Sequence, residues 1–263
     1  RAGPLPNGYR RRRLRCYRGP GHLRRCARSL HGMPEGYDRN AAVGHLRDAD
    51  HDLRAHIDTV GPCPLTPAPD VGPHTLFDRL ASSILSQQLS VKAAATIAGR
   101  LRERAADPPP AAGGRAPLVP GRVSALSDEE LRACGISRPK IAALRDLSDA
   151  VGTGRIPTLT ELTRLDDDEV VASLTAVRGV GRWTAEMLLI FLLDRPDVFP
   201  VADVGVRRGF EQVLGLDQTA TVEQMLARSE SWAPYRSVAS WYLWRAVDQS
   251  GQAVPAPTTP GVR

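Results

Sequence analysis

Apolar residues recur at three- and four-residue steps along most of the chain, which is the spacing of amphipathic helices. Between Val43 and Val60 these steps predict a single helix, which Gly61 and the proline after it end. Residues 75–104 predict two helices on either side of residues 86–90, a polar run with two adjacent glutamines that we call the glutamine loop. Ser90, the last residue of this loop, is suited to cap the second helix.

Helical spacing continues through the middle of the chain. Ser127 and Glu130 have the spacing of a capping box, which predicts the start of a helix. Residues 166–169 are four consecutive acids; they suggest a metal cluster at first sight, but acids at a helix start are explained more simply as a cap that suits the helix dipole. Further helices are predicted over residues 137–150, 159–165 and 168–177.

Residues 173–189 predict a helix end, a tight glycine turn and a second helix that begins near Arg182 or at the residue after it. Gly179 and Gly181 bracket one residue of the turn, so the backbone there can take conformations that a Cβ would resist. A glycine turn that opens a helix presents free N–H groups and a positive dipole end, which suit a phosphate oxygen. The same spacing is typical of an ordinary helical hairpin that binds nothing, so both interpretations stay open.

A single carboxylate follows the predicted hairpin. Pro200 ends one element, and Asp203 stands where an N-cap would open the next helix. Asp203 is therefore either a cap and nothing more, or a carboxylate at the mouth of a cleft, about twenty residues beyond a turn that grips phosphate.

Composition limits the class of protein. The chain has 263 residues, of which 42% are hydrophobic and 24% charged, enough for one large or two small globular domains. No apolar run reaches the roughly 18 residues that a membrane-spanning helix needs. The four cysteines are far apart and unpatterned, which favours reduced thiols over disulfides or a zinc site. They are Cys16, Cys26, Cys63 and Cys134.

Positive charge gathers at the N-terminus. The whole chain carries a net +6, but residues 1–47 hold 12 arginines and two acids, so the remainder carries a net charge of −4. Any DNA-binding face must then be made locally, by amides and a few arginines. Residues 1–42 are expected to be an arginine-rich, disordered segment, or alternatively a basic arm that adds DNA affinity, and residues 251–263 a flexible tail.

The hairpin, the Gly/Pro-rich loop and Asp203 together resemble the helix-hairpin-helix (HhH-GPD) DNA glycosylases, most closely the 3-methyladenine DNA glycosylase II branch. The resemblance covers residues 43–250 and implies an all-α glycosylase domain of two helical lobes with the active-site cleft between them. It also implies that the β-rich N-terminal domain of the prototype is lacking, because residues 1–42 are too weakly patterned to supply it.

The resemblance implies a monofunctional enzyme that flips alkylated purines, of the 3-methyladenine and 7-methylguanine type, out of DNA and hydrolyses their N-glycosidic bond in base excision repair. Asp203 matches the catalytic aspartate, and Trp244, Trp183 and Met187 match the base pocket, although the prototype has a tyrosine where this chain has Met187. Gln88 matches the wedge that fills the gap left by the flipped base. The matched DNA-binding positions are Gln88, Leu89, Arg178, Gly179, Val180, Gly181, Arg182 and Thr184.

The resemblance also bears on cofactors. Members with lyase activity carry a lysine where this chain has Trp183, so no lyase step is expected; Fe–S members carry four closely spaced C-terminal cysteines, and none follows Cys134. No cofactor is required, but the carbonyls of Thr175, Val177 and Val180 match those that hold a structural Na⁺ or K⁺ in the family hairpin.

The implied partner is double-stranded DNA that contains damaged bases, and the protein is expected to bind it as a monomer. The expected location is the cytoplasm of a bacterium, at the nucleoid and away from membranes. Two alternatives remain. One is a glycosylase of the same superfamily for oxidised or mismatched bases. The other is a non-catalytic hairpin module that binds DNA and needs neither Asp203 nor Trp244.

Overall fold

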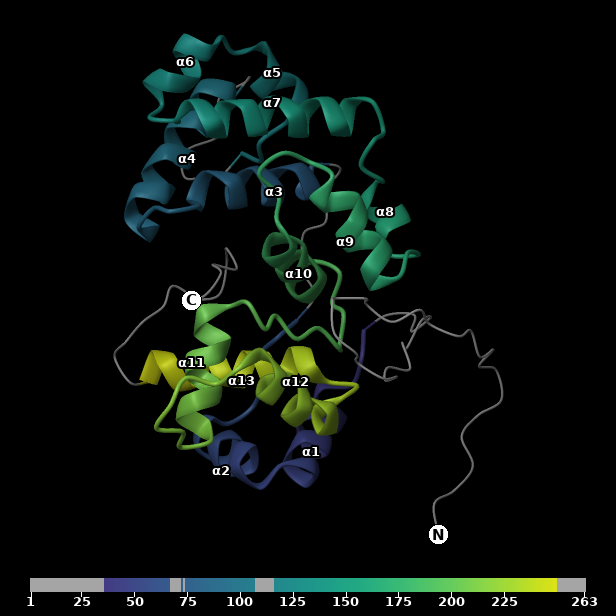
Figure 1. The fold of residues 1–263 in the computed structure, drawn as a ribbon. Coiled ribbons are helices and arrows are strands. Elements are labelled where there is room, and N and C mark those ends of the chain that lie inside the picture. Colours follow the sequence, from purple (N-terminus) through teal and green to yellow (C-terminus); the bar gives the residue numbers. More distant parts are fainter. Residues whose placement is uncertain (1–35, 67–71, 73, 107–115, 250–263) are drawn as a thin grey trace.

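The computed structural model describes residues 36–66, 72, 74–106 and 116–249, and within these ranges every regular element is a helix. The long helices in the upper part of Figure 1 are α3 (Thr75–Ser86), α4 (Val91–Ala105) and α7 (Arg138–Gly152), with α5 (Pro120–Ala125), α6 (Asp128–Ala133), α8 (Leu159–Leu162) and α9 (Asp167–Thr175) around them. The lower part holds α1 (Arg39–Ala49), α2 (His51–Val60), α11 (Val204–Val213), α12 (Val222–Ser229), the 3₁₀ turn η1 (Glu230–Trp232) and α13 (Arg236–Gln249).

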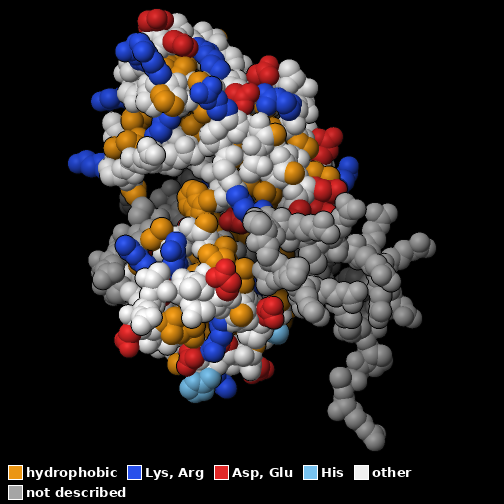
Figure 2. Space-filling model, viewed as in Figure 1, with side chains coloured by type: hydrophobic (Ala, Val, Ile, Leu, Met, Phe, Trp, Pro, Cys, Tyr) orange, Lys and Arg blue, Asp and Glu red, His pale blue; other side chains and the backbone are white. Residues whose placement is uncertain are grey.

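The helices form two lobes, as predicted (Figure 1), and on the face that Figure 2 shows, basic and acidic side chains are interspersed over both lobes. In the upper lobe α7 is central and packs against α3, α5 and α6. In the lower lobe α13 is central and packs against α11, α2 and α1, so the N-terminal helices of the described chain are built into the same lobe as the C-terminal ones. The predicted all-α, two-lobed fold is confirmed.

Helix α10 (Arg182–Phe191) lies between the lobes and packs against α9 and α3 (Figure 1). Residues 184–190 are all buried, which is expected of a helix covered on every side. The chain that leaves it ties the lobes together: the guanidinium of Arg195 donates to the carbonyl of Leu165 at 2.7 Å, while its own carbonyl accepts from Ser237 on α13 at 2.6 Å.

The prediction of a single helix over residues 43–60 is wrong. The structure has two helices with a break at Asp50, whose backbone is extended (φ −147°, ψ 114°). The buried carboxylate of Asp50 caps α2 by accepting from the amides of Asp52 and Leu53 at 3.1 Å each, and it also binds Arg228 and the indole of Trp232. These contacts with the far end of the chain outweigh the continuous apolar spacing.

The first described helix also begins earlier than the expected boundary at residue 42. Asp38 caps α1 by accepting from the amides of Asn40 and Ala41, so the helix starts at Arg39. Arg39 then forms an ion pair with Asp194, beyond the end of α10. The rest of the arginine-rich segment, residues 1–35, and the predicted tail at 251–263 lie outside the described residues.

The predicted caps are confirmed. Ser90 accepts from the amide of Ala93, and Ser127 and Glu130 form a reciprocal capping box. Residues 166–169 are the cap of α9, with Asp166 and Glu169 in a second capping box, so this acidic run is a helix start. Across the described chain no group of three or more His, Cys, Asp or Glu side chains is placed to hold a metal ion. None of the described helices is long and apolar enough to cross a membrane.

Candidate active site

Asp203 is the N-cap of α11, and its Oδ1 accepts from the amide of Val206 at 2.8 Å. The cap predicted from the sequence is therefore present. Asp203 is only 7% exposed, which is unusual for a cap, because most capping carboxylates lie in water. Its position at the start of a lower-lobe helix, against α10, places the carboxylate where the two lobes meet.

Two indoles orient this carboxylate from different elements. The Nε1–H of Trp244, on α13, donates to Oδ1 of Asp203 at 2.9 Å, and that of Trp183, on α10, donates to Oδ2 at 2.6 Å. Hydrogen bonds to a carboxylate are among the stronger ones in proteins. A cap alone needs only the amide, so the two tryptophans indicate that the direction of this carboxylate matters for another reason.

The two tryptophans differ in what they leave open to solvent. Trp244 is buried, and its ring stacks on Phe191 with centroids 5.6 Å apart and an interplanar angle of 26°. Trp183 is 37% exposed, and Met187, one turn along α10, is buried. Of the three residues predicted to line a base pocket, Trp183 has the most surface available for stacking, whereas Trp244 mainly supports Asp203.

Gly205 makes room for this arrangement. A Cβ built on Gly205 would lie 2.9 Å from Cδ1 of Trp244 and 3.0 Å from Oδ1 of Asp203. Both distances are shorter than normal van der Waals contact, so a side chain at this position would displace the indole or the carboxylate. The residues around Gly205 in the sequence do not indicate this need for glycine, because it arises where the indole from α13 meets the carboxylate of Asp203.

A second carboxylate lies nearby that the sequence analysis also missed. Glu186 is 7% exposed, and Arg182, four residues earlier, donates to its Oε1 at 3.0 Å. Burial raises the pKa of Glu186; Arg182 opposes this shift and the negative charge of Asp203 adds to it. The i, i+4 spacing of Arg182 and Glu186 was the available signal in the sequence.

The hairpin has the predicted turn, with one correction. Gly179 has φ +81°, a left-handed conformation that favours glycine, and a Cβ there would lie 2.9 Å from Cβ of Ala143 on α7. Gly181 has φ −94° and open space around it, so its backbone conformation does not require glycine. The prediction that the glycines allow backbone conformations that a Cβ would resist is confirmed for Gly179 and wrong for Gly181.

The predicted DNA-binding side chains separate into two groups. Arg178, Gly179, Gly181 and Arg182 are exposed at the hairpin turn. The side chain of Thr184 is 5% exposed and lies 3.3 Å from the hydroxyl of Ser83, so it is not available to a ligand. The side chain of Val180 is also buried. Thr184 and Val180 could therefore contact DNA only through their backbone atoms.

The hairpin amides are partly used within the protein. The N–H of Arg178 donates to Asp146 on α7 at 2.7 Å, and that of Val180 donates to the carbonyl of Val177 at 3.1 Å. Gly181, the N-cap of α10, has no side chain to accept from the first turn of the helix. The amides at the start of α10 are therefore the ones suited to an anionic ligand.

The glutamine loop lies beside the hairpin. Gln88 and Leu89 are exposed, and Gln88 has φ +58°, which is uncommon for a residue with a side chain. The side-chain amide of Gln87 donates to the carbonyl of Gly179 at 2.8 Å. The structure thus brings the two predicted DNA-contacting segments together, although 92 residues separate the bonded pair.

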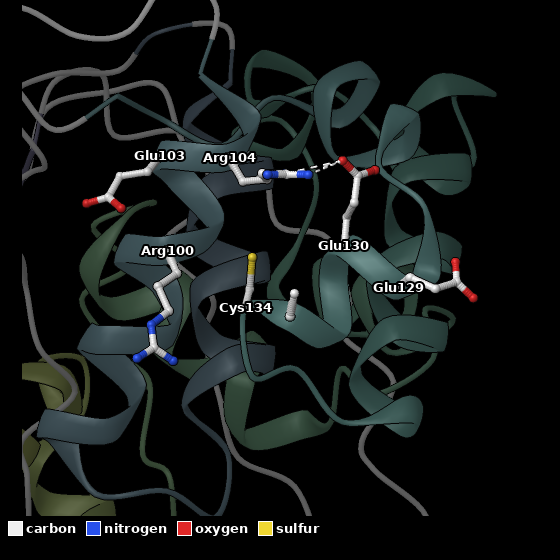
Figure 3. Close-up of a pocket in the computed structure, with 7 residues that line it drawn as sticks. Arg100, Glu103, Arg104, Glu129, Glu130 and Cys134 are labelled. Carbon is white, nitrogen blue, oxygen red and sulfur yellow. Dashed lines mark hydrogen bonds and ion pairs between the residues drawn. The ribbon is translucent and has the colours of Figure 1, made fainter.

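A groove in the upper lobe is unrelated to Asp203. It encloses about 550 Å³ between α4 and α6, and Figure 3 shows Arg104 reaching across it to Glu130, with Cys134 between the two helices. Burial raises the pKa of the Cys134 thiol, so it stays protonated near neutral pH. Its walls carry two arginines and three glutamates, and Arg104 and Glu130 form an ion pair. The residues lining it are Arg100, Glu103, Arg104, Glu129, Glu130, Ala133 and Cys134.

The chain is similar to known proteins in sequence and in fold. Residues 81–234 match the model of the HhH-GPD superfamily base excision DNA repair proteins. The chain is 38% identical to DNA-3-methyladenine glycosylase 1 of Schizosaccharomyces pombe over 169 residues, which are 64% of this chain and 71% of that protein.

Two solved structures agree with this relationship. One is the S. pombe 3-methyladenine DNA glycosylase Mag1 in complex with abasic DNA, which superimposes with a TM-score of 0.67 at 33% identity and covers 79% of this chain and 97% of that one. The other is DNA-3-methyladenine glycosidase from Bacillus halodurans, with a TM-score of 0.68 at 34% identity over 82% of this chain and 93% of that one. The chain therefore belongs to the HhH-GPD superfamily of base excision DNA repair proteins, in its 3-methyladenine DNA glycosylase branch.

Proposed function

We propose that this protein is a monofunctional DNA glycosylase that hydrolyses the N-glycosidic bond of alkylated purines in base excision repair. The observation that carries the proposal is Asp203, a buried carboxylate where the lobes meet, which two indoles and one backbone amide hold in a fixed direction. The names of two relatives, DNA-3-methyladenine glycosylases at 38% and 32% identity, support the same chemistry.

The reaction needs a surface that stacks on the flipped base and a carboxylate that stabilises the positive charge on the sugar. Extrusion of a damaged nucleotide costs a few kcal/mol, and stacking on an aromatic face returns about 1–3 kcal/mol per base. Trp183 is partly exposed and available for that stacking. A cationic base would stack on the indole more strongly than a neutral one, because the ring face attracts positive charge. The glycosidic bond then breaks with its electron pair leaving on the base, and Asp203 stabilises the positive charge on the sugar. Water adds to the C1′ carbon and loses a proton, which Asp203 accepts and passes to solvent.

A lyase step would need an amine nucleophile at this site. The sequence contains two lysines, Lys92 and Lys140, and both lie in the upper-lobe helices α4 and α7. Lys140 donates to the carbonyls of Leu85 and Gln87 at 2.7 Å each. Trp183 stands beside Asp203 instead, so the abasic product is expected to leave without strand cleavage.

DNA is the partner that the site and the Mag1 complex support. The amides at the start of α10 suit a phosphate, and Gln88 and Leu89, which are exposed, would fill the gap that the flipped base leaves in the stack. Duplex with a damaged base as the preferred substrate, a monomer as the active form and the bacterial nucleoid as the place of action are parts of the same proposal.

The hairpin carbonyls remain a proposed site for Na⁺ or K⁺. Thr175 is the last residue of α9, and Val177 and Val180 lie in the turn before α10. The carbonyl of Val177 already accepts from the amide of Val180, which leaves it one lone pair for a cation. A cation there would add positive charge next to the bound phosphate. No divalent metal ion, redox cofactor or Fe–S cluster enters the proposed reaction, so EDTA, which removes divalent ions, is expected to leave base release unchanged.

The test is base release from methylated duplex DNA by the wild type and by Asp203→Asn, with alkali added afterwards to reveal abasic sites. We expect release of 3-methyladenine or 7-methylguanine by the wild type and no strand break before alkali. Asp217→Asn, an exposed aspartate between α11 and α12, is the matched control and should equal the wild type. Release of oxidised bases only, or binding without any release, would favour the alternatives and reject the proposal.

A further inference from the structure

The two adjacent glutamines of the glutamine loop face opposite ways. Gln87 is half-buried, and its side-chain amide donates to the carbonyl of Gly179 in the hairpin at 2.8 Å. Gln88 and Leu89 are exposed. The first glutamine thus joins the loop to the hairpin, while the next two residues stay free for a ligand.

Helix α7 holds the glutamine loop at its start. The Nζ of Lys140 donates to the carbonyls of Leu85 and Gln87, each at 2.7 Å. These carbonyls lie at the C-terminal end of α3, where the helix itself offers no N–H partner and where a positive charge suits the dipole. The conformation of the loop, including the left-handed Gln88, therefore depends on a residue of another helix.

The same helix holds the hairpin. Asp146 accepts from the amide of Arg178 at 2.7 Å, and Ala143 packs so closely against Gly179 that no side chain fits there. Lys140, Ala143 and Asp146 follow one another at three-residue steps, which makes them neighbours on the helix surface. Six residues of an α-helix span about 9 Å, so one stripe of α7 sets the distance between the hairpin and the glutamine loop.

We propose that Gln87 and Lys140 are positioning residues for nucleotide extrusion, because they hold the glutamine loop at a fixed distance from the hairpin. This inference rests on the proposed function. The hairpin would hold the strand by its phosphates while Gln88 enters the gap left by the flipped base, and both contacts form together only when their spacing fits the DNA. A loop that is already ordered before binding loses less conformational entropy when it enters the duplex.

The experiment compares paired and unpaired substrates. Gln87→Met removes the donor at nearly constant length. On duplex DNA with 7-methylguanine, its single-turnover rate is expected to fall about tenfold, whereas on the same lesion in single-stranded DNA it should stay within about twofold of the wild type, because no stacked pair must be opened there. Lys140→Met is expected to show the same selective loss, and Lys140→Arg, which keeps a cationic donor, to recover most of the duplex rate.

Gln218→Met, at an exposed position between α11 and α12, is the matched control and should leave both rates unchanged. A Gln87→Met variant with equal losses on both substrates would have a general folding or catalytic defect, and that result would overturn the proposal. Equal rates to the wild type on both substrates would overturn it too.

Failure of the proposed function looks different, because the wild type itself would release no base. In that case the unstacking of 2-aminopurine placed opposite an abasic site reports extrusion without chemistry. The Gln87→Met variant should then give a weaker fluorescence rise than the wild type, and an equal rise would reject the positioning role.

Discussion

The indole N–H of Trp183 donates to Oδ2 of Asp203 at 2.6 Å, and it does so from the first turn of the hairpin's second helix. The first turn of α10 therefore contributes to both proposed parts of the site. Its amides face the hairpin turn, where a phosphate is expected, and its second residue orients the carboxylate. If the hairpin binds the DNA strand as proposed, that binding and the orientation of Asp203 would be coupled through a single helical turn.

Replacing Trp183 by phenylalanine should separate these contributions. Trp183→Phe keeps an aromatic face and removes the N–H donor to Asp203. A hydrogen bond to a charged group contributes about 1.5–3 kcal/mol, so we expect the single-turnover rate to fall about 10- to 100-fold with little change in affinity for abasic duplex. Trp183→Ala also removes the stacking surface and should weaken that affinity. An unchanged rate for Trp183→Phe would show that the indole does not orient Asp203 for the reaction.

Gly205→Ala should damage the site without unfolding the protein. The new Cβ would lie 2.9 Å from the indole of Trp244 and 3.0 Å from Oδ1 of Asp203, so one of them must move. Because misplacement of a catalytic group by about 1 Å often costs 100-fold in rate, we expect a loss of that order in base release, with DNA affinity largely retained.

The matched control for Gly205→Ala is Gly44→Ala, an exposed position in α1 where a Cβ meets nothing within 4 Å. Alanine in an open helical position stabilises by about 0.5–1 kcal/mol, so this control should melt slightly higher and keep full activity. Full activity of Gly205→Ala as well would mean that α11 and α13 adjust without cost to Asp203.

The two hairpin glycines should respond differently to substitution. Gly179→Val forces a branched side chain into a left-handed backbone and against Ala143, so it should distort the turn and weaken binding to all DNA sequences alike, since phosphate contacts carry no sequence information. Gly181→Ala introduces no steric conflict and adds no acceptor for the amides at the start of α10, so its affinity should stay close to that of the wild type. Titration of labelled duplexes of unrelated sequence checks both, and normal affinity of Gly179→Val would show that the turn does not grip DNA.

Most helices were predictable because their signals are local. Ser90, Ser127 and Asp166 cap helices through residues only three positions away, and the sequence displays both partners. The break at Asp50 was not predictable in this way. Its partners Arg228 and Trp232 are 178 and 182 residues distant, and the apolar spacing on either side continues through the break.

In the candidate site, too, the features with local signals were predictable, and those that depend on distant contacts were not. Asp203 as a helix cap follows from its neighbours, but the two indoles that orient it come from other helices. Gln87 and Gln88 are indistinguishable in the sequence, and only the approach of the hairpin decides which of them faces the protein. The matched positions were found by resemblance, whereas the supporting residues depend on contacts that a single sequence does not display.

Asp50 should make the stability of the lower lobe sensitive to acid. Burial raises the pKa of this carboxyl, but the hydrogen bonds from Arg228, the Leu53 amide and Trp232 together outweigh burial and hold the pKa below its usual value of 3.8. A group with a lowered pKa in the folded state contributes stability that is complete above the pKa of the unfolded chain and is lost as the pH falls through the folded value. We therefore expect the melting temperature to decrease below about pH 4.

Asp50→Asn isolates this contribution. The substitution leaves Arg228 without its buried carboxylate, so the free energy of unfolding at pH 7 should fall by about 1–3 kcal/mol, and the remaining decrease in acid should be smaller than in the wild type. Asp58→Asn is the control: its pair with Arg47 is nearly half exposed on both sides, and such pairs contribute about 0–1 kcal/mol. Denaturant titrations at pH 7 and pH 3 measure both variants. If Asp50→Asn were as stable as the wild type at pH 7, the network around Asp50 would not be what ends α1 and begins α2.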